Sequence, residues 1–300
     1  YQSIDPMEMV KLVILSMCIV SCHVQKSSQS IELFNTSYRV FGSGDPLLII
    51  NGGPGMNSDG FAPIAKEIAA MGFQTIIYDQ RGTGLSKLNK IDSTTITMDL
   101  MVDDIENLRK KLKIKKWSVF GHSFGGIMAT YYLSKHPSSI DKVIFSSSGG
   151  VNMNFLQYLG DRYNQLLTKA EQDSLTYYEN ADLPEEEKIS SRAKILAKAY
   201  VFDKSHAPVI AQRLTQLDRK INGLVIDDLL RIKFDFTYKM LGCKVPVLVI
   251  QGKDDIIMVE TAQEIFDSFG NAKMILLDNC GHYGWLDARD QYLTAVREFL

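Results

Sequence analysis

Short apolar segments alternate with amphipathic ones along most of this 300-residue chain, and this alternation limits the possible folds more than any other feature. The expected strands are predominantly apolar, which is typical of parallel strands covered on both faces. Helices between such strands provide the crossovers that a parallel sheet needs. We therefore expect an α/β fold with a mostly parallel central sheet and helices on both faces. The expected strands are Leu47–Ile50, Gln74–Tyr78, Trp117–Phe120, Val143–Ser147, Val245–Gln251 and Lys273–Leu277.

Helical patterns fill most of the space between these strands, and Ile31–Phe41 has the pattern of an N-terminal hairpin. The alternation stops between about Gly150 and Leu241, where only helical patterns occur. We therefore expect a core of residues 31–149 and 242–300, and an inserted helical cap at residues 150–241. The expected core helices are Gly60–Met71, Thr97–Leu112, Phe124–His136, Val259–Phe269 and Leu286–Leu300, and the expected cap helices are Leu166–Tyr178, Glu185–Val201 and Pro208–Leu217.

The N-terminal segment has the pattern of a secretion signal. Lys11 precedes the apolar run Leu12–Val20, which is shorter than the roughly 20 residues that span a bilayer but suits the apolar region of a signal peptide. The run ends in Ile-Val-Ser followed by Cys22, which resembles the lipobox of bacterial lipoproteins, whose cysteine is acylated. We expect a signal peptide at residues 1–22, a polar tether at residues 23–30 and a lipid anchor at Cys22. The alternative is an apolar first strand with an incidental cysteine.

This pattern implies a protein of the bacterial cell envelope that touches the membrane through its lipid anchor only. Cys243 and Cys280 would lie at opposite ends of the sheet, too far apart for a disulfide. The net charge of −2 gives no basis for nucleic-acid binding. No cysteine or histidine spacing indicates a metal site, so we expect neither a metal nor a cofactor.

The most specific local motif surrounds Ser123, in the order Gly-His-Ser-Phe-Gly from Gly121 to Gly125. It lies between an expected strand and an expected helix, which is the setting of the nucleophile elbow in α/β-hydrolases. A sharp strand-to-helix turn exposes the serine, and the small residues on either side prevent clashes. A glycine-rich turn without chemistry is the alternative. The motif predicts that Ser123 is a nucleophile.

A nucleophilic serine needs a base and an acid that orients the base, and in this fold they follow the serine in the order acid, then histidine. Asp254 and Asp255 follow the expected strand that ends near Gly252, and Asp255 has the usual offset of three residues from that glycine. His282 follows the last expected strand, after a glycine. We expect Asp255 and His282 to complete a catalytic triad with Ser123.

Two backbone amides should stabilise the oxyanion of the tetrahedral intermediate. The first belongs to Phe124, directly after the nucleophile. The second should lie in the glycine-rich loop from Asn51 to Gly55, and we expect it to be the amide of Gly53. Glycines there allow the backbone to approach a substrate closely.

These motifs resemble the proline iminopeptidase family of α/β-hydrolases. That family carries His-Gly-Gly-Pro-Gly where this chain has Asn51–Gly55, and Asp-Gln-Arg-Gly-x-Gly-x-Ser where this chain has Asp79–Ser86. The resemblance implies a serine aminopeptidase that releases an N-terminal residue, often proline, from small peptides. It also implies that Asp79 and Arg81 brace the loops around the site. Asn51 replaces the family's histidine, and Phe124 replaces a common tryptophan.

An aminopeptidase must bind a free ammonium group, for which acidic side chains near the pocket are suited. Many acids occur in the expected cap, and none can be matched to the family's amine-binding glutamates. Two alternatives stay open. One is a carboxylesterase or lipase that uses the same triad on an ester substrate, and the other is a non-catalytic envelope protein that binds a ligand. The acids in question are Glu171, Asp173, Glu179, Asp182, Glu185, Glu186, Glu187, Asp203, Asp218, Asp227, Asp228 and Asp235.

Overall fold

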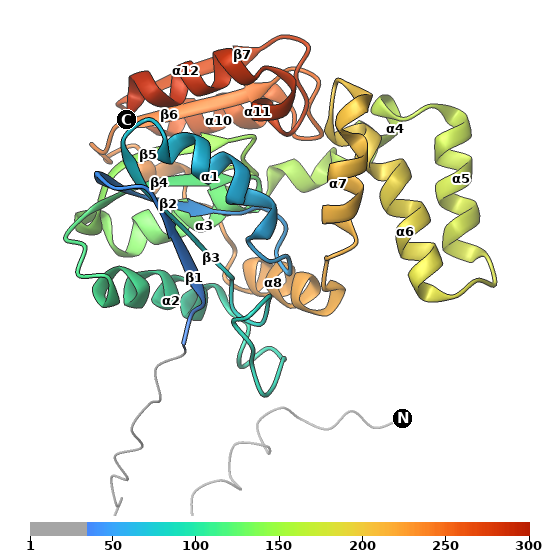
Figure 1. Ribbon diagram of the computed structural model, residues 1–300, viewed down its shortest axis with the longest axis horizontal. Coiled ribbons are helices and arrows are strands. Elements are labelled where there is room, and N and C mark those ends of the chain that lie inside the picture. The colour runs from blue at the N-terminus through green and yellow to red at the C-terminus, as the bar shows by residue number, and fades with distance from the viewer. Residues whose placement is uncertain (1–34) are drawn as a thin grey trace, which may run out of the picture. The chain divides into compact units, whose positions relative to one another are not determined.

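A computed structural model describes residues 35–300 of the chain (Figure 1). The expected signal peptide, the tether and Cys22 lie outside the described residues and stay predictions. Within residues 35–300, every helix is too short or too polar to span a bilayer. Cys243 and Cys280 are both free thiols, and Cys280 is buried.

The centre of the fold is a seven-stranded sheet in the order β1-β3-β2-β4-β5-β6-β7. Only β1 runs antiparallel to its neighbour, and the other strands are parallel. The expected α/β-hydrolase fold with a mostly parallel sheet is therefore confirmed. The strands are β1 (Tyr38–Phe41), β2 (Asp45–Ile50), β3 (Phe73–Tyr78), β4 (Trp117–His122), β5 (Ile140–Ser146), β6 (Val247–Gly252) and β7 (Ala272–Leu277).

Successive residues of each strand point to opposite faces of the sheet, so the strands contribute to two separate cores. In β2, Leu48 and Ile50 join the core under α2, α3 and α10, whereas Leu47 and Ile49 join the core under α1 and α12. The helices of the core outside the segment between β5 and β6 are α1 (Ala62–Ala69), α2 (Met98–Lys111), α3 (Phe124–Lys135), α10 (Val259–Ser268), α11 (Gly284–Asp287) and α12 (Arg289–Phe299).

Between β5 and β6 the described chain forms helices and no strand, and we call residues 154–240 the helical segment. Figure 1 shows α4 to α7 gathered beside the sheet, with α6 between α5 and α7, against both of which it packs. The segment consists mainly of α4 (Leu159–Leu166), α5 (Lys169–Asn180), α6 (Glu185–Leu196), α7 (Ala207–Leu214), α8 (Arg219–Arg231) and α9 (Thr237–Met240).

Several details differ from expectation, and α4 and α9 were also not among the expected helices. No hairpin forms in the described part of Ile31–Phe41, because β1 pairs with β3 instead of with a neighbour in sequence. The expected single helix Leu286–Leu300 is interrupted at Ala288, which has a non-helical backbone and separates α11 from α12. The sequence analysis missed α8, which is capped by the Asp218 carboxylate and fixed to α2 through a hydrogen bond of 2.8 Å from Met98 N to Asp228.

The crossing of α3 over β2 leaves no room for a side chain at Gly125, where an added Cβ would lie 2.0 Å from the Ile50 carbonyl oxygen. We expect Gly125→Ala to lower the free energy of unfolding by about 1–3 kcal/mol, because backbone must move. The matched control is Gly223→Ala in α8, where an added Cβ meets nothing within 4 Å. This control should gain roughly 0.5–1 kcal/mol from helix propensity. Urea unfolding measures both, and similar effects at the two positions would contradict the argument.

Candidate active site

Ser123 occupies the turn between β4 and α3 with a backbone conformation of φ 55° and ψ −121°. A positive φ is unfavourable for a residue with a side chain, so neighbouring groups must hold it. Ser123 N donates to the Ser146 carbonyl, and the amides of Gly126 and Gly149 both donate to the Ser123 carbonyl, each over 3.0 Å. The turn is therefore fixed from β5 and from its own helix, and it has the geometry of a nucleophile elbow.

Asp255 and His282 lie together at the ends of β6 and β7, and both are buried. His282 Nδ1 is 2.7 Å from Asp255 Oδ1. The same carboxylate accepts hydrogen bonds from Ile257 N over 2.9 Å and from Gln251 Nε2 over 2.8 Å. The structure thus places Asp255, and not Asp254, against the imidazole. Gln251, which the sequence analysis did not single out, orients the second carboxylate oxygen.

Ser123 makes no hydrogen bond to His282 among the described residues. The two are nevertheless near each other, because the ring of His122, the residue next to Ser123, lies 4.6 Å from the ring of His282 between centroids. The backbone of His282 is fixed by a hydrogen bond of 2.8 Å from its N–H to the Tyr200 carbonyl. A serine–histidine hydrogen bond is often long before substrate binds and tightens in the reacting complex.

His122 is buried in a cluster of aromatic rings beside His282. Its Nδ1 lies 3.2 Å from Ser146 Oγ, which also accepts a hydrogen bond from the Tyr292 hydroxyl. Burial lowers the pKa of His122 well below its usual value, and the nearby charges of His282 and Arg213 lower it further. A neutral His122 avoids charge repulsion when the neighbouring imidazole becomes protonated.

The two expected oxyanion donors, the amides of Gly53 and Phe124, line the same cavity as Ser123. Neither N–H donates to another group within residues 35–300. Gly52 approaches Ser123 so closely that a Cβ added to it would lie 2.6 Å from the Ser123 Cβ. Gly53 has a φ of 71°, which favours glycine. The glycine pair therefore permits a backbone position that other residues would block.

Side chains from the core hold this loop. Asn51 Nδ2 donates to the carbonyls of Gly52 and Met56 over 3.1 and 3.2 Å, so this residue does anchor the loop in place of the family's histidine. Gln80 Nε2 donates to the Asn51 carbonyl over 2.9 Å. Asp79 accepts from both the amide and the hydroxyl of Ser58, over 2.9 and 2.8 Å. The second family motif thus braces the loop.

Arg81 of the same motif lies further from the loop. Its guanidinium forms a bidentate pair with Asp104 of α2, with nitrogen–oxygen distances of 2.9 and 2.7 Å. Burial raises the pKa of Asp104 to about 6, an effect that Arg81 opposes. Arg81 therefore ties the motif to α2.

The helical segment holds the loop from the other side, through residues that the sequence analysis missed. Arg213 of α7 donates to the carbonyls of Gly52 and Asn57 over 3.1 and 3.3 Å. The amide of Asp218 donates to the Gly55 carbonyl over 2.9 Å, and Asn222 Nδ2 donates to the Pro54 carbonyl over 3.1 Å. No motif surrounds these residues, so only the tertiary structure reveals their role.

The cavity over Ser123 has a volume of about 460 Å³ and is mostly apolar. It extends from the sheet into the helical segment, where Leu159, Leu196 and Ile226 line it. Its only charged lining residues, within the described chain, are Arg192 and Arg219. None of the acids of the helical segment lines it. The cavity is therefore shaped for an apolar group, and the ammonium-binding carboxylates expected of an aminopeptidase are not among its lining residues.

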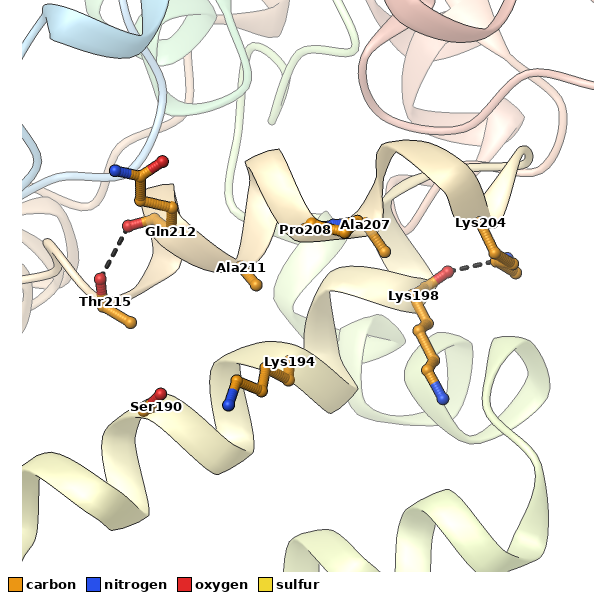
Figure 2. A pocket seen from close by; sticks show the side chains of 9 residues that line it. All are labelled: Ser190, Lys194, Lys198, Lys204, Ala207, Pro208, Ala211, Gln212 and Thr215. Carbon is orange, nitrogen blue, oxygen red and sulfur yellow. Dashed lines mark hydrogen bonds between the residues drawn. The ribbon is translucent and has the colours of Figure 1, made fainter.

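A second cavity of about 600 Å³ lies between α6 and α7, and Ser123 does not line it (Figure 2). Three lysines line this cavity. Lys198 forms an ion pair with Glu171 over 2.7 Å. Lys204 Nζ donates to the Lys198 carbonyl over 2.8 Å, a hydrogen bond drawn as a dashed line in Figure 2. Two of the three ammonium groups are thus bound within the protein, and we assign this cavity no role in the chemistry.

Comparison with known proteins agrees with the fold. A family model described as alpha/beta hydrolase fold matches residues 45–288. The proline iminopeptidase of Saccharolobus solfataricus is 26% identical over 283 residues, which cover 90% of this chain and 89% of that protein. Among solved structures, the proline iminopeptidase of Mycobacterium smegmatis has a TM-score of 0.70 at 21% identity, covering 88% of this chain and 93% of that one. An esterase of Exiguobacterium antarcticum has a TM-score of 0.67 at 17% identity, covering 88% and 94%.

The buried His122 should make stability depend on pH. Its folded-state pKa lies well below the value of about 6.5 that it has in an unfolded chain, so below pH 6.5 the unfolded chain binds an extra proton. Above pH 6.5 this contribution vanishes. We therefore compare the free energy of unfolding of His122→Gln with that of the wild type at each pH. The difference, variant minus wild type, should be about 1.4 kcal/mol more positive at pH 5.5 than at pH 7.5.

Urea unfolding of both proteins at the two pH values measures this difference. His206→Gln, which removes a histidine outside the ring cluster, is the control. A stability difference between wild type and His122→Gln that stays the same at both pH values would show that the pKa of His122 is equal in the folded and unfolded chain, and would contradict the prediction.

Proposed function

The chain belongs to the α/β-hydrolase fold family, and on that premise we propose that it is a serine hydrolase of the proline iminopeptidase type, which releases an N-terminal residue from short peptides. The observation that carries the hydrolase chemistry is the meeting of Ser123, Gly53 and Phe124 on one apolar cavity beside the Asp255–His282 pair. The peptide substrate is inferred from the curated relatives, which are named as proline iminopeptidases.

In the proposed mechanism, His282 Nε2 accepts the proton of Ser123 as the serine oxygen attacks the acyl carbon. Asp255 holds the Nδ1–H tautomer of the imidazole and stabilises its protonated form. The Gly53 and Phe124 amides bind the oxyanion, and each such donor is worth roughly 10²–10³ in rate. His282 then protonates the leaving group, and water hydrolyses the acyl-enzyme by the same steps in reverse. The apolar cavity holds the acyl group.

A carboxylesterase is the second candidate, and the composition of the cavity favours it. An ammonium group in an apolar cavity without a carboxylate loses its hydration without compensation. A neutral ester has no such cost. Arg219 also repels an ammonium group and would not repel an ester, whereas the charge of Arg192 is balanced by an ion pair with Glu179 over 3.0 Å.

Blocking the substrate's amine separates the two functions. For an aminopeptidase, proline 4-nitroanilide should have a kcat/KM about 10- to 100-fold above that of its N-acetyl derivative, because a hydrogen-bonded charge contributes roughly 1.5–3 kcal/mol. For an esterase, 4-nitrophenyl butyrate should be hydrolysed and the free and acetylated anilides should not differ.

Ser123→Ala should abolish every activity and also labelling by a fluorophosphonate. An unlabelled wild type would refute the serine hydrolase.

We also propose that the protein is anchored in the bacterial cell envelope through Cys22. The support is the sequence pattern alone, an apolar run that ends in a lipobox-like tetrapeptide. Expressed in a bacterium fed with radioactive palmitate, the protein should be labelled and sediment with membranes. Cys22→Ser should lose the label and Cys18→Ser, the control within the apolar run, should keep it. A wild type without label would refute the anchor.

A further inference from the structure

Arg213 carries a buried charge that no carboxylate neutralises among the described residues. Its side chain is 5% exposed, and its guanidinium stacks 4.8 Å from the centre of the Phe61 ring. Its two hydrogen bonds to protein carbonyls both end on the loop that follows β2, at Gly52 and Asn57. Burying an unpaired cation is costly, so the contacts that it makes there must compensate for that cost.

The bond to Gly52 determines where the next amide points. In a planar trans peptide, the carbonyl of one residue and the N–H of the next point in opposite directions. The Gly52 carbonyl and the Gly53 N–H belong to one such unit. A carbonyl held on Arg213 therefore directs the Gly53 N–H away from α7, and Gly53 lines the cavity that contains Ser123.

The peptide between two glycines is unusually free to rotate, because neither flanking residue has a Cβ to restrict φ and ψ. A flip would put the carbonyl oxygen of Gly52 where the N–H stood and would repel an oxyanion. Arg213 and Asn51 Nδ2 both donate to that carbonyl over 3.1 Å, which opposes the flip. A charged donor on the carbonyl also polarises the whole peptide unit and strengthens its N–H as a donor.

We propose that Arg213 is a positioning residue of the oxyanion hole: from α7 it locks and polarises the Gly52–Gly53 peptide so that the Gly53 amide faces the reacting carbonyl. This inference rests on the proposed serine hydrolase mechanism and holds for an amide or an ester substrate. It assigns the helical segment a part in the chemical step besides its part in lining the cavity. The packing of α7 positions Arg213 and thereby affects how strongly the Gly53 amide stabilises the transition state.

Transition-state and ground-state analogues test this role. An alkyl trifluoromethyl ketone forms a bond from its carbonyl carbon to Ser123 Oγ, its oxygen becomes an oxyanion, and the serine proton passes to His282. The corresponding alcohol forms no such adduct. In Arg213→Met, kcat/KM for 4-nitrophenyl butyrate should fall about 10- to 100-fold with KM nearly unchanged. The inhibition constant of the ketone should rise by the same factor, and that of the alcohol should not change.

Two further variants complete the design. Arg213→Lys keeps the cation but has one donor nitrogen where the guanidinium bonds two carbonyls through two nitrogens, so it should retain an intermediate ketone affinity. If Arg213→Met does not fold, the Arg213→Lys variant decides alone. Arg297→Met, which removes an exposed cation from α12, is the control for charge loss. The inference would be overturned if a folded Arg213 variant kept the ketone affinity of the wild type, or if ketone and alcohol were weakened equally. Neither result would affect the proposed function. A wild type that resists the fluorophosphonate would overturn the proposed function and the inference with it.

Discussion

The strained turn at Ser123 is the constraint on which the rest of the site depends. A positive φ at a residue with a side chain costs on the order of 1–3 kcal/mol, and the surrounding fold must supply it. It does so through the hydrogen bonds that Ser123 exchanges with β5 and α3, and through the absence of side chains where α3 crosses β2. The same turn places the hydroxyl, the Phe124 amide and the start of α3 at one point, so that the proposed nucleophile and the proposed oxyanion donor share a single element.

The sheet and its covering helices were largely predictable because their signals are local. Apolar strands and amphipathic helices repeat with fixed periods, and buried strands such as Leu47–Ile50 stand out without knowledge of their partners. Pairing is a property of the whole fold, so the partner of Tyr38–Phe41 was predicted wrongly. Helix α8 was missed because polar residues such as Lys220 and Asn222 weaken its apolar face, and its packing on α2 comes from residues far away in sequence.

The same division applies to the site. Ser123, Asp255 and His282 could be predicted because each follows a strand with a characteristic neighbour, and the fold brings strand ends together. Gln251 and Arg213 have no such context. An arginine on an amphipathic helix is ordinarily a solvated residue, and nothing in its neighbours indicates that its charge is buried on a loop some 160 positions earlier in the chain. The cavity, too, could not be predicted, since its composition depends on which faces of α4, α6 and α8 point inward.

All four hydrogen bonds described between the helical segment and the loop after β2 end on main-chain carbonyls. Main-chain oxygens are present whatever the residue, so these four hydrogen bonds do not depend on the side chains of the loop. The loop still requires glycine at Gly52, Gly53 and Gly55, where an added Cβ would lie 2.5–2.6 Å from a neighbouring atom. Three of the four donors are side-chain groups of Arg213 and Asn222, and the fourth is the main-chain amide of Asp218. Asn222 also lines the cavity, so the wall that a substrate would contact and the support of the loop share a residue.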